Sequence, residues 1–236
     1  MDLQGKVTVI VGGEGPLGRE VSKKFLAEGA KVLVGWYAQK EWEEARGSLT
    51  DDHGRLIDMN VDATQEEQVQ KLMQKATETF GSIDILLHMV GTFHAGPMLW
   101  ETETATWERL MDVNLKSAFL CAKHAIKVML DKKKGRIVFF PARVAQEPQP
   151  RFGAYAVSKS GLITMINALR EELKDTNITV NGVMPSVMDT FRTRHMPNPQ
   201  PDKWVKPSEI AELLCSVCSD GSAALSGSIL KVFGKL

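Results

Sequence analysis

The chain has 236 residues, of which 43% are hydrophobic and 25% are charged, and its 29 basic and 29 acidic residues give a formal net charge of zero. This composition excludes a disordered chain and offers no broad electrostatic footprint for nucleic acid or an anionic membrane. No apolar run approaches the roughly 18 residues of a membrane span, and the first residues lack a secretory pattern. We therefore expect one large cytoplasmic α/β domain over residues 1–236, with no nucleic-acid or membrane partner.

The three cysteines are Cys121, Cys215 and Cys218, and this odd, small number fits a reducing compartment better than a disulfide framework. Cys215 and Cys218 form a Cys-x-x-Cys pair, but apolar residues at helical spacing surround them, which predicts small buried helix residues. A zinc site needs a second pair of ligands. We therefore predict no metal site.

Strand-like and helix-like segments alternate along the chain. The expected strands are apolar runs, as in a parallel sheet covered on both faces, at 7–11, 31–35, 55–61, 83–90, 136–140, 178–183 and 228–233. The expected helices carry apolar residues at helical spacing, at about 16–29, 39–52, 64–80, 104–114, 115–131, 153–174 and 208–219. This alternation predicts a doubly wound, seven-stranded parallel sheet, the Rossmann fold, in a single α/β domain.

Two local patterns refine this prediction. Thr64 and Glu67 have the spacing of a capping box at the start of a helix. The stretch from Pro185 to Pro207 contains five prolines and few apolar residues. It is too long for an ordinary connection, and such loops are often active-site lids, so we expect a lid or substrate loop at about 186–207.

A glycine-rich turn, VGGEGPLG over residues 11–18, follows the first strand. Glycines between a buried strand and an amphipathic helix let the backbone approach a pyrophosphate, whose charge meets the helix N-terminus. Pro16 removes one of the amide donors. We predict that a nicotinamide dinucleotide binds at this turn, against Gly12, Gly15, Leu17 and Gly18.

The form of the cofactor stays open at the end of the second strand, which reads VGWYAQK over residues 34–40. An acid there favours NAD and a base accommodates the phosphate of NADP. Trp36 stands in the expected place and is neither. Lys40 could reach a 2′-phosphate, whereas Glu14 in the glycine-rich turn would repel one, which leaves a slight preference for NAD.

Tyr155 and Lys159 are spaced to share one face of a helix. A free tyrosine has a pKa of about 10, and a nearby ammonium favours its ionised form. Such a tyrosine can exchange a proton with a substrate while hydride moves at a nicotinamide. For an isolated pair, a packed tyrosine beside a solvated lysine would be the better interpretation.

The pair is not isolated, because the whole chain resembles the short-chain dehydrogenase/reductase family. The motifs that carry this resemblance are the glycine-rich turn, VDAT at 61–64, DVNL at 112–115, YAVSK at 155–159 and ITVNGVMP at 178–185. The resemblance implies that Tyr155 is the catalytic acid and base. It implies that Lys159 lowers the pKa of Tyr155 and holds the nicotinamide ribose, and that Asn114 is the third catalytic residue. It also implies cofactor contacts at Trp36, Asp62, Ala63, Val90, Gly91, Pro185, Val187 and Thr190.

Two departures from the family pattern stand out. The fourth strand ends HMVG over 88–91, where most members have Asn-Asn-Ala-Gly. No serine occurs between Gly135 and Tyr155, although the family carries its catalytic serine in this region, where the chain reads PARVA over 141–145. That serine donates a hydrogen bond to the reacting oxygen, and losing such a donor typically costs about 10²–10³ in rate.

Three explanations for the missing serine remain open. The substrate is an activated electrophile, such as a conjugated imine, that needs Tyr155 alone as proton donor. Another donor replaces the serine, with Arg143, Thr92 and His94 as candidates. Alternatively, catalysis is lost and the protein binds a dinucleotide for another purpose.

Dihydropteridine reductases are similar in lacking the serine while keeping the tyrosine and lysine, and their lid resembles residues 188–204. We identify the chain as nearest to short bacterial oxidoreductases of this kind, and expect an NAD(P)H-dependent reductase of a carbonyl or conjugated imine. The alternatives are a non-catalytic dinucleotide-binding protein and a dihydropteridine reductase. The expected substrate-side residues are Ala142, Arg143, His94 and Trp204.

The resemblance also implies self-association. Family members commonly pair the long helices on either side of the fifth strand into four-helix interfaces. The corresponding helices here are at about 115–131 and 153–174, so we expect a homodimer or homotetramer acting on a small-molecule substrate.

Overall fold

Seven parallel strands form one sheet in the computed structural model, which describes residues 3–50 and 54–235. The strands are β1 Val7–Val11, β2 Lys31–Trp36, β3 Leu56–Asn60, β4 Ile85–His88, β5 Lys134–Phe139, β6 Asn177–Pro185 and β7 Ile229–Val232. Their order is β3-β2-β1-β4-β5-β6-β7, and every neighbouring pair is parallel. The prediction of a doubly wound, seven-stranded parallel sheet is confirmed.

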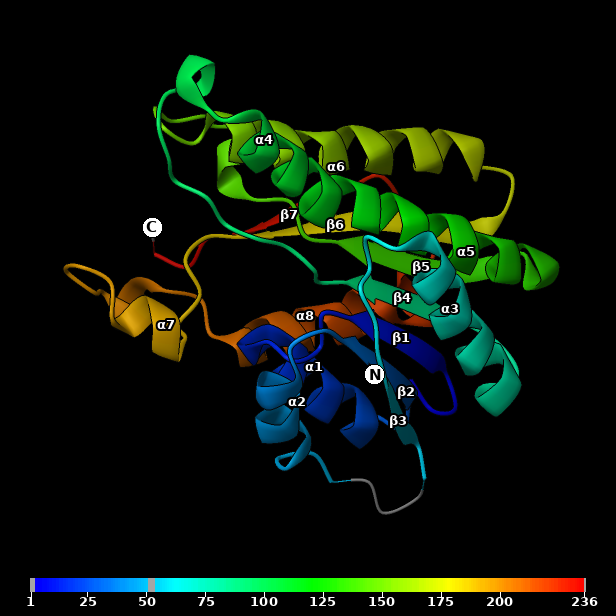
Figure 1. The fold of residues 1–236 in the computed structure, drawn as a ribbon. Helices are drawn as coiled ribbons and strands as arrows, with labels where there is room; N and C mark the ends of the chain where they lie inside the picture. Colours follow the sequence, from blue (N-terminus) through cyan, green and yellow to red (C-terminus); the bar gives the residue numbers. More distant parts are fainter. Residues whose placement is uncertain (1–2, 51–53, 236) are drawn as a thin grey trace.

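Helices cover both faces of this sheet (Figure 1). One face carries α1 Pro16–Ala27, α2 Gln39–Arg46 and α8 Pro207–Cys218, and the other carries α3 Glu66–Phe80, α4 Thr104–Met111, α5 Ser117–Lys132 and α6 Gly153–Glu172. Each layer buries its own apolar cluster against the sheet, with Phe25 in the first and Ile137 in the second. Because both faces are covered, the strands are apolar on both sides, as their sequences indicated.

The direction of the strand order reverses between β1 and β4. These two strands pair in register up to Val11 and His88, so the turns that follow them leave the sheet side by side. A Cβ atom on Gly12 would lie 2.8 Å from the backbone nitrogen of Val90. In open α/β sheets ligands bind in the crevice at this switch point, which is where the site should be sought.

The segment after β6 carries the predicted lid, about 186–207. It contains a short helix, α7 Phe191–Arg194, and a 3-10 turn, Pro201–Lys203. A bridge between Met188 and Val205 joins the two ends of the segment. In Figure 1 the α7 region projects from the body of the fold on the same side as the chain's C-terminus.

Two predicted helix details are wrong. The predicted capping box at Thr64 and Glu67 does not form, because Asp62 Oδ1 accepts hydrogen bonds from both the backbone N–H and the hydroxyl of Thr64. This local turn competes with the cap, and the helix begins at Glu66 with Gln65 before it. The helix predicted over 39–52 ends at Arg46, where Gly47 follows. The last two residues of this predicted helix, 51 and 52, lie outside the described residues.

The helices predicted at 104–114 and 115–131 run on from each other. A π-helical turn, Asp112–Lys116, joins α4 to α5 and buries Asn114 inside it. The extra residue of a π-turn redirects side chains within a helix, and such turns are frequent at functional sites.

The cysteines behave as the sequence indicated. Cys121, Cys215 and Cys218 are buried free thiols, the last two within α8. Burial raises the pKa of Cys121 to about 12, so this thiol is unreactive at neutral pH. Among the described residues, no helix combines the length and the apolar character that crossing a membrane requires.

Candidate active site

The glycine-rich turn brings backbone so close together that side chains are excluded. Gly12 has a positive φ of 85° in addition to its contact with the turn after β4. A Cβ atom on Gly18 would lie 2.5 Å from the Cα atom of Gly13. Glycine is required at both positions, because a side chain on Gly12 would strike the turn after β4 and a side chain on Gly18 would push α1 away from the turn after β1.

The N-terminus of α1 is open at the switch point. Gly15 precedes the helix and gives it no side-chain cap, and a Cβ atom on Gly15 would meet nothing closer than 3.9 Å. The first-turn N–H groups of Leu17 and Gly18 have no partner within a helix. Pro16, which has no N–H, occupies the first helical position. This close backbone cradle below an open helix end fits the pyrophosphate of a dinucleotide.

The predicted adenosine-side residues lie at the carboxyl edge of the sheet. Trp36 ends β2, but its indole Nε1–H donates to Asp58 Oδ1 at 2.8 Å and its ring stacks on Trp42. After β3, the backbone N–H of Asp62 donates to Gln68 Oε1 at 2.8 Å, and Ala63 is buried beside it. The structure therefore places these residues together, with the indole N–H of Trp36 already bound within the protein.

Tyr155 and Lys159 lie on α6, as predicted, and both are largely buried. Lys159 Nζ donates to the backbone carbonyl of Phe140 at 3.0 Å. A Cβ atom on Gly91 would lie 3.0 Å from this Nζ atom, so the glycine leaves room for the lysine. The ring of Phe93 meets the ring of Tyr155 edge to face, with centroids 5.4 Å apart. The turn after β4 thus covers both residues.

Burial sets the protonation of this pair. It raises the pKa of Tyr155 to about 12 and lowers that of Lys159 to about 8. Burial of the phenol sets the direction of the Tyr155 pKa, while the Lys159 ammonium binds the carbonyl of Phe140. The lowering of this pKa by Lys159 stays a prediction. At neutral pH the tyrosine is a neutral phenol and the lysine is an ammonium ion.

Asn114 ties the turn after β4 to α6. Its Oδ1 accepts from the backbone N–H of Thr92 at 2.7 Å, and its Nδ2 donates to the backbone carbonyl of Thr92 at 3.0 Å. The same Nδ2 donates to Ser158 Oγ at 2.9 Å, and that hydroxyl donates to the carbonyl of Tyr155. Ser158 was not predicted as a site residue, although its place directly before Lys159 is a signal that it faces the sheet.

His88 explains how the altered end of β4 is accommodated. Its Nε2 lies 2.9 Å from Ser117 Oγ, and Ser117 Oγ donates to the carbonyl of Val113. Because the hydroxyl has one hydrogen, the Nε2–H of His88 must be the donor to Ser117. Burial and the charge of Lys159 lower the pKa of His88 to about 3, so the ring is neutral. His88 therefore holds β4 to the π-turn that carries Asn114.

Comparison with known proteins identifies the family. The family model described as short chain dehydrogenase matches residues 6–200. The chain belongs to the short-chain dehydrogenase/reductase family. Its relatives are named as dehydrogenases and reductases, and the chain is an NAD(P)-dependent oxidoreductase of this family.

The relatives differ in the substrates for which they are named. The 3-oxoacyl-[acyl-carrier-protein] reductase FabG of Thermotoga maritima is 26% identical, over 100% of this chain and 99% of its own. The meso-2,3-butanediol dehydrogenase of Serratia marcescens is 27% identical, over 99% of this chain and 95% of its own. Sequence similarity at this level therefore gives the family and leaves the substrate open.

Solved structures agree on the fold. A short-chain dehydrogenase/reductase from Serratia marcescens BCRC 10948 superposes with a TM-score of 0.90 at 26% identity, covering 100% of this chain and 99% of its own. One from Mycobacterium ulcerans superposes with a TM-score of 0.91 at 20% identity, covering 100% of this chain and 90% of its own, a likeness of fold alone.

The segment after β5, where the sequence led us to expect the family serine, carries Ala142 and Arg143. Ala142 has no polar side-chain atom, and Arg143 Nε pairs with Glu147 Oε2 at 2.7 Å while its guanidinium lies over the ring of Phe233. His94 folds onto Gly96, and its Nε2 is buried with no hydrogen-bond partner among the described residues. Among the three predicted substitutes, His94 therefore has a buried side-chain nitrogen that no group of the described residues satisfies.

The residues predicted to form the lid follow β6. Pro185 ends β6, and the carbonyl of Val187 accepts from the backbone N–H of Val205 across the base of the lid. Thr190 caps α7, because its Oγ1 accepts from the backbone N–H of Thr193 at 3.2 Å. Trp204 is half-buried where the lid returns. The lid thus has internal structure of its own beside the switch point.

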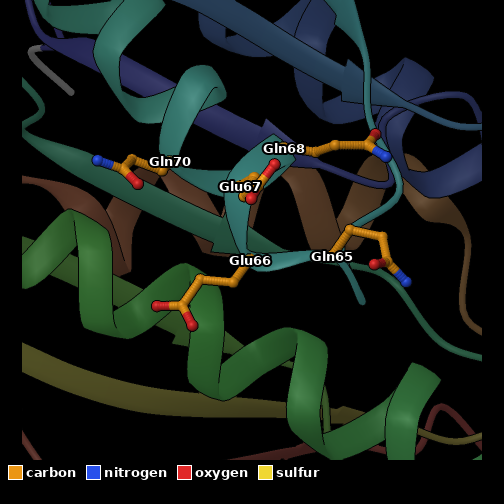
Figure 2. Close-up of a pocket in the computed structure, with 5 residues that line it drawn as sticks. All are labelled: Gln65, Glu66, Glu67, Gln68 and Gln70. Atoms are coloured by element: carbon orange, nitrogen blue, oxygen red, sulfur yellow. The ribbon is translucent and has the colours of Figure 1, made fainter.

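A separate depression of about 470 Å³ lies at the first turn of α3. Figure 2 shows the side chains that line it: Gln65, Glu66, Glu67, Gln68 and Gln70. Glu66 points toward α5 and pairs with Lys123 and His124, which lowers the pKa of its carboxyl. None of the predicted catalytic residues lines this depression, and its labelled side chains point in different directions rather than toward one point.

Proposed function

We propose that the chain is an NAD(P)H-dependent reductase that transfers hydride to a carbonyl or a conjugated imine, with Tyr155 as the proton donor. The observation that carries this proposal is the buried pair on α6. Tyr155, with its pKa raised to about 12, holds its proton at neutral pH, and Lys159 lies buried behind Gly91. A reductase needs a protonated acid in this place.

The bound dinucleotide supplies the hydride. The turn at Gly12 and the open first turn of α1 would hold its pyrophosphate, and Lys159 would hold the nicotinamide ribose. The further residues that we propose to contact it are Trp36, Asp62, Ala63, Val90, Gly91, Pro185, Val187 and Thr190. Their positions around the switch point support this assignment.

Proton delivery is the task of the two residues on α6. As negative charge develops on the substrate oxygen or nitrogen, the phenol of Tyr155 donates its proton to that atom. The phenolate that remains lies in a buried site, where the Lys159 ammonium stabilises it. Asn114 holds the covering turn through Thr92 and holds α6 through Ser158. The chain then needs a proton from solvent to restore the phenol.

The missing serine favours a substrate that is already activated. Ala142 cannot donate, and Arg143 is engaged with Glu147 and Phe233. A conjugated imine accepts hydride with one proton donor, and a quinonoid dihydropterin is a narrower case of this class. His94 is the residue to test if a second donor proves necessary.

The test compares the two tyrosines of the chain, Tyr155 and the exposed Tyr37. Purified protein is screened for NADH and NADPH oxidation against carbonyls, quinones and a quinonoid dihydropterin. Tyr155→Phe should abolish turnover of any accepted substrate while leaving dinucleotide binding nearly intact, and Tyr37→Phe should retain turnover. Normal turnover by Tyr155→Phe would refute the mechanism. Dinucleotide binding without turnover across the panel would favour the non-catalytic alternative.

We also propose a homodimer or homotetramer built through α5 and α6. Both helices carry exposed apolar side chains, among them Phe119, Leu130 and Val157. The three free thiols are compatible with our further proposal that the enzyme acts in the cytoplasm.

A further inference from the structure

Glu14 is the acidic residue of the glycine-rich turn, and its side chain reaches the end of β2. Its Oε1 accepts a hydrogen bond of 3.2 Å from the backbone N–H of Tyr37, the residue that follows β2. Its other oxygen, Oε2, is buried and has no hydrogen-bond partner within residues 3–50 and 54–235. Buried polar atoms of native proteins are nearly always hydrogen-bonded to protein, ligand or water, so this oxygen is an acceptor that a ligand or a water would satisfy.

The end of β2 is where a Rossmann domain reads the ribose of its cofactor. An acid there accepts a hydrogen bond from the 2′-hydroxyl of NAD. In this chain the strand ends with Trp36, whose indole N–H is engaged with Asp58. The strand end therefore offers a ribose no carboxylate of its own.

The backbone at this strand end is held in place. Asn60 Nδ2 donates to the carbonyls of both Trp36 and Tyr37, at 3.2 Å each. The N–H of Tyr37 that binds Glu14 is consequently part of a fixed segment. The carboxylate is anchored through one oxygen, with the other left as an acceptor.

We propose that Glu14 supplies, from the glycine-rich turn, the carboxylate that β2 lacks, and that it makes the protein selective for NADH over NADPH. Oε2 accepts the hydrogen bond of a ribose hydroxyl. A 2′-phosphate at that point would meet a fixed negative charge and offer no proton to Oε2. Lys40, the cation that could attract such a phosphate, is exposed in the first turn of α2, where water screens its charge.

This inference rests on the proposed dinucleotide-dependent function and names the form of the cofactor. Its test is equilibrium binding of NADH and NADPH, followed by protein fluorescence quenching and calorimetry, without any substrate. We compare the wild-type protein with Glu14→Gln, Glu14→Asp and Glu20→Gln. Glu20 is a matched control, because it is also a glutamate but lies within α1, after the glycine-rich turn.

The wild-type protein should bind NADH at least about 10-fold more tightly than NADPH, as the loss of one hydrogen bond to a charged group predicts. Glu14→Gln keeps the side-chain shape and removes the charge, so the preference should fall by about 10-fold. Glu14→Asp keeps the charge but shortens the reach, so NADH binding should weaken while NADPH remains excluded. Glu20→Gln should match the wild-type protein.

If the ratio of NADH affinity to NADPH affinity is the same in the wild-type protein and in Glu14→Gln, the assignment of Glu14 is overturned. A wild-type protein that binds NADPH more tightly than NADH would also overturn it. If Glu14→Gln does not fold, the Glu14→Asp comparison decides, because unchanged NADH binding in that variant also overturns it. A wild-type protein that binds neither dinucleotide would instead overturn the proposed function, and this inference with it.

Discussion

Lys159 carries a positive charge on a side chain that is only 6% exposed. Burial lowers the pKa of this lysine from 10.5 to about 8, and its one hydrogen bond in the described structure is to the carbonyl of Phe140. A pKa difference of this size corresponds to about 3 kcal/mol of unfavourable free energy when the folded protein holds the charge. In the proposed mechanism the same charge stabilises the phenolate of Tyr155, so this residue would lower stability in exchange for activity.

Replacing this lysine should therefore stabilise the fold. Lys159→Met removes the buried charge and leaves the carbonyl of Phe140 without its donor, which costs about 1 kcal/mol. We expect the free energy of unfolding at pH 7 to rise by about 2 kcal/mol, with complete loss of turnover. The measurement is urea denaturation followed by circular dichroism, with the exposed Lys174→Met as the control.

The pH dependence of this difference has a definite sign. Below pH 8 the lysine is protonated in both the folded and the unfolded wild-type protein, so the gain of Lys159→Met is complete. Between pH 8 and about 10.5 the folded protein releases the proton while the unfolded chain keeps it, which stabilises the wild-type protein. The advantage of the variant should disappear over this range. Tyr155 and the buried cysteines titrate in both proteins and cancel in the difference. An advantage that is independent of pH would contradict a buried charge at Lys159.

Sequence spacing predicts which residues share a helix face, and this was enough to pair Tyr155 with Lys159. It does not predict the direction in which the pKa of Tyr155 shifts, because that depends on burial of the phenol, to which Phe93, far away along the chain, contributes. The same holds for Glu14. The sequence was enough to predict that the charge of Glu14 would repel a phosphate. Its hydrogen bond with the backbone N–H of Tyr37 is visible only in the folded structure.

The π-turn between α4 and α5 is the element that holds Asn114 in the site. Asn114→Ala would leave the N–H and carbonyl of Thr92 and the hydroxyl of Ser158 without this partner. We expect a loss of about 2–4 kcal/mol in the free energy of unfolding, because buried groups lose their hydrogen bonds. We also expect turnover to fall strongly, since the turn that covers Tyr155 loses its anchor.

A second asparagine provides the control for this substitution. Asn60 also binds two backbone carbonyls through its side chain, but it is exposed. Asn60→Ala should cost less than about 1 kcal/mol, because water replaces the lost bonds. Equal losses for the two variants in thermal or urea unfolding would contradict the role given to the buried π-turn.

The predicted lid segment contains an ion pair within itself. Arg194 donates to both carboxylate oxygens of Asp189, which lowers the pKa of that carboxyl, and the pair is intact at neutral pH. Arg194→Ala should speed tryptic cleavage after Arg192 and Lys203 without changing the global melting temperature. Asp189→Asn should have the same effect on cleavage after Lys203.

Lys203 is the cleavage site that remains in every variant and allows a direct comparison. Arg192 is exposed and makes no ion pair among the described residues, so Arg192→Ala should leave cleavage after Lys203 at the wild-type rate. Mass spectrometry of the fragments over time gives the rates. Equal acceleration by Arg192→Ala and Arg194→Ala would show that the ion pair does not hold the lid.

At the level of elements, the sequence predicted all seven strands because apolar runs between turns are distinctive. It missed the π-turn, because residues 104–132 carry apolar positions that fit two helices as well as one interrupted helix. It predicted a capping box at Thr64 because threonine and glutamate stand at the spacing that this motif requires, yet the box does not form. Asp62, two residues earlier, competes for the same hydroxyl. Such competition between local hydrogen bonds is settled by geometry that a motif does not contain.

The two layers of the whole molecule differ in what they leave exposed. On the face formed by α5 and α6, a shallow groove of about 250 Å³ lies between the helices, lined mainly by apolar residues that include Phe119, Ile126, Met165 and Leu169. Phe119 is 51% exposed, Leu130 43% and Val157 43%. Apolar patches of this kind on a soluble domain mark contact surfaces, and a two-fold axis would pair the same patch on both subunits.

A charge placed in this groove should therefore dissociate the assembly. Phe119→Asp occurs twice in a two-fold interface and buries two like charges, so we expect the dissociation constant to rise at least about 100-fold. Phe191→Asp is the control, because Phe191 is 82% exposed but lies on the lid. Sedimentation equilibrium at micromolar concentration should show an oligomer for the wild-type protein and for Phe191→Asp, and a monomer for Phe119→Asp. A wild-type monomer at that concentration, or an unchanged oligomer in Phe119→Asp, would contradict assembly through α5 and α6. Since the fold of each subunit encloses its own Tyr155 and Lys159, the monomer should still bind dinucleotide, which separates loss of assembly from loss of folding.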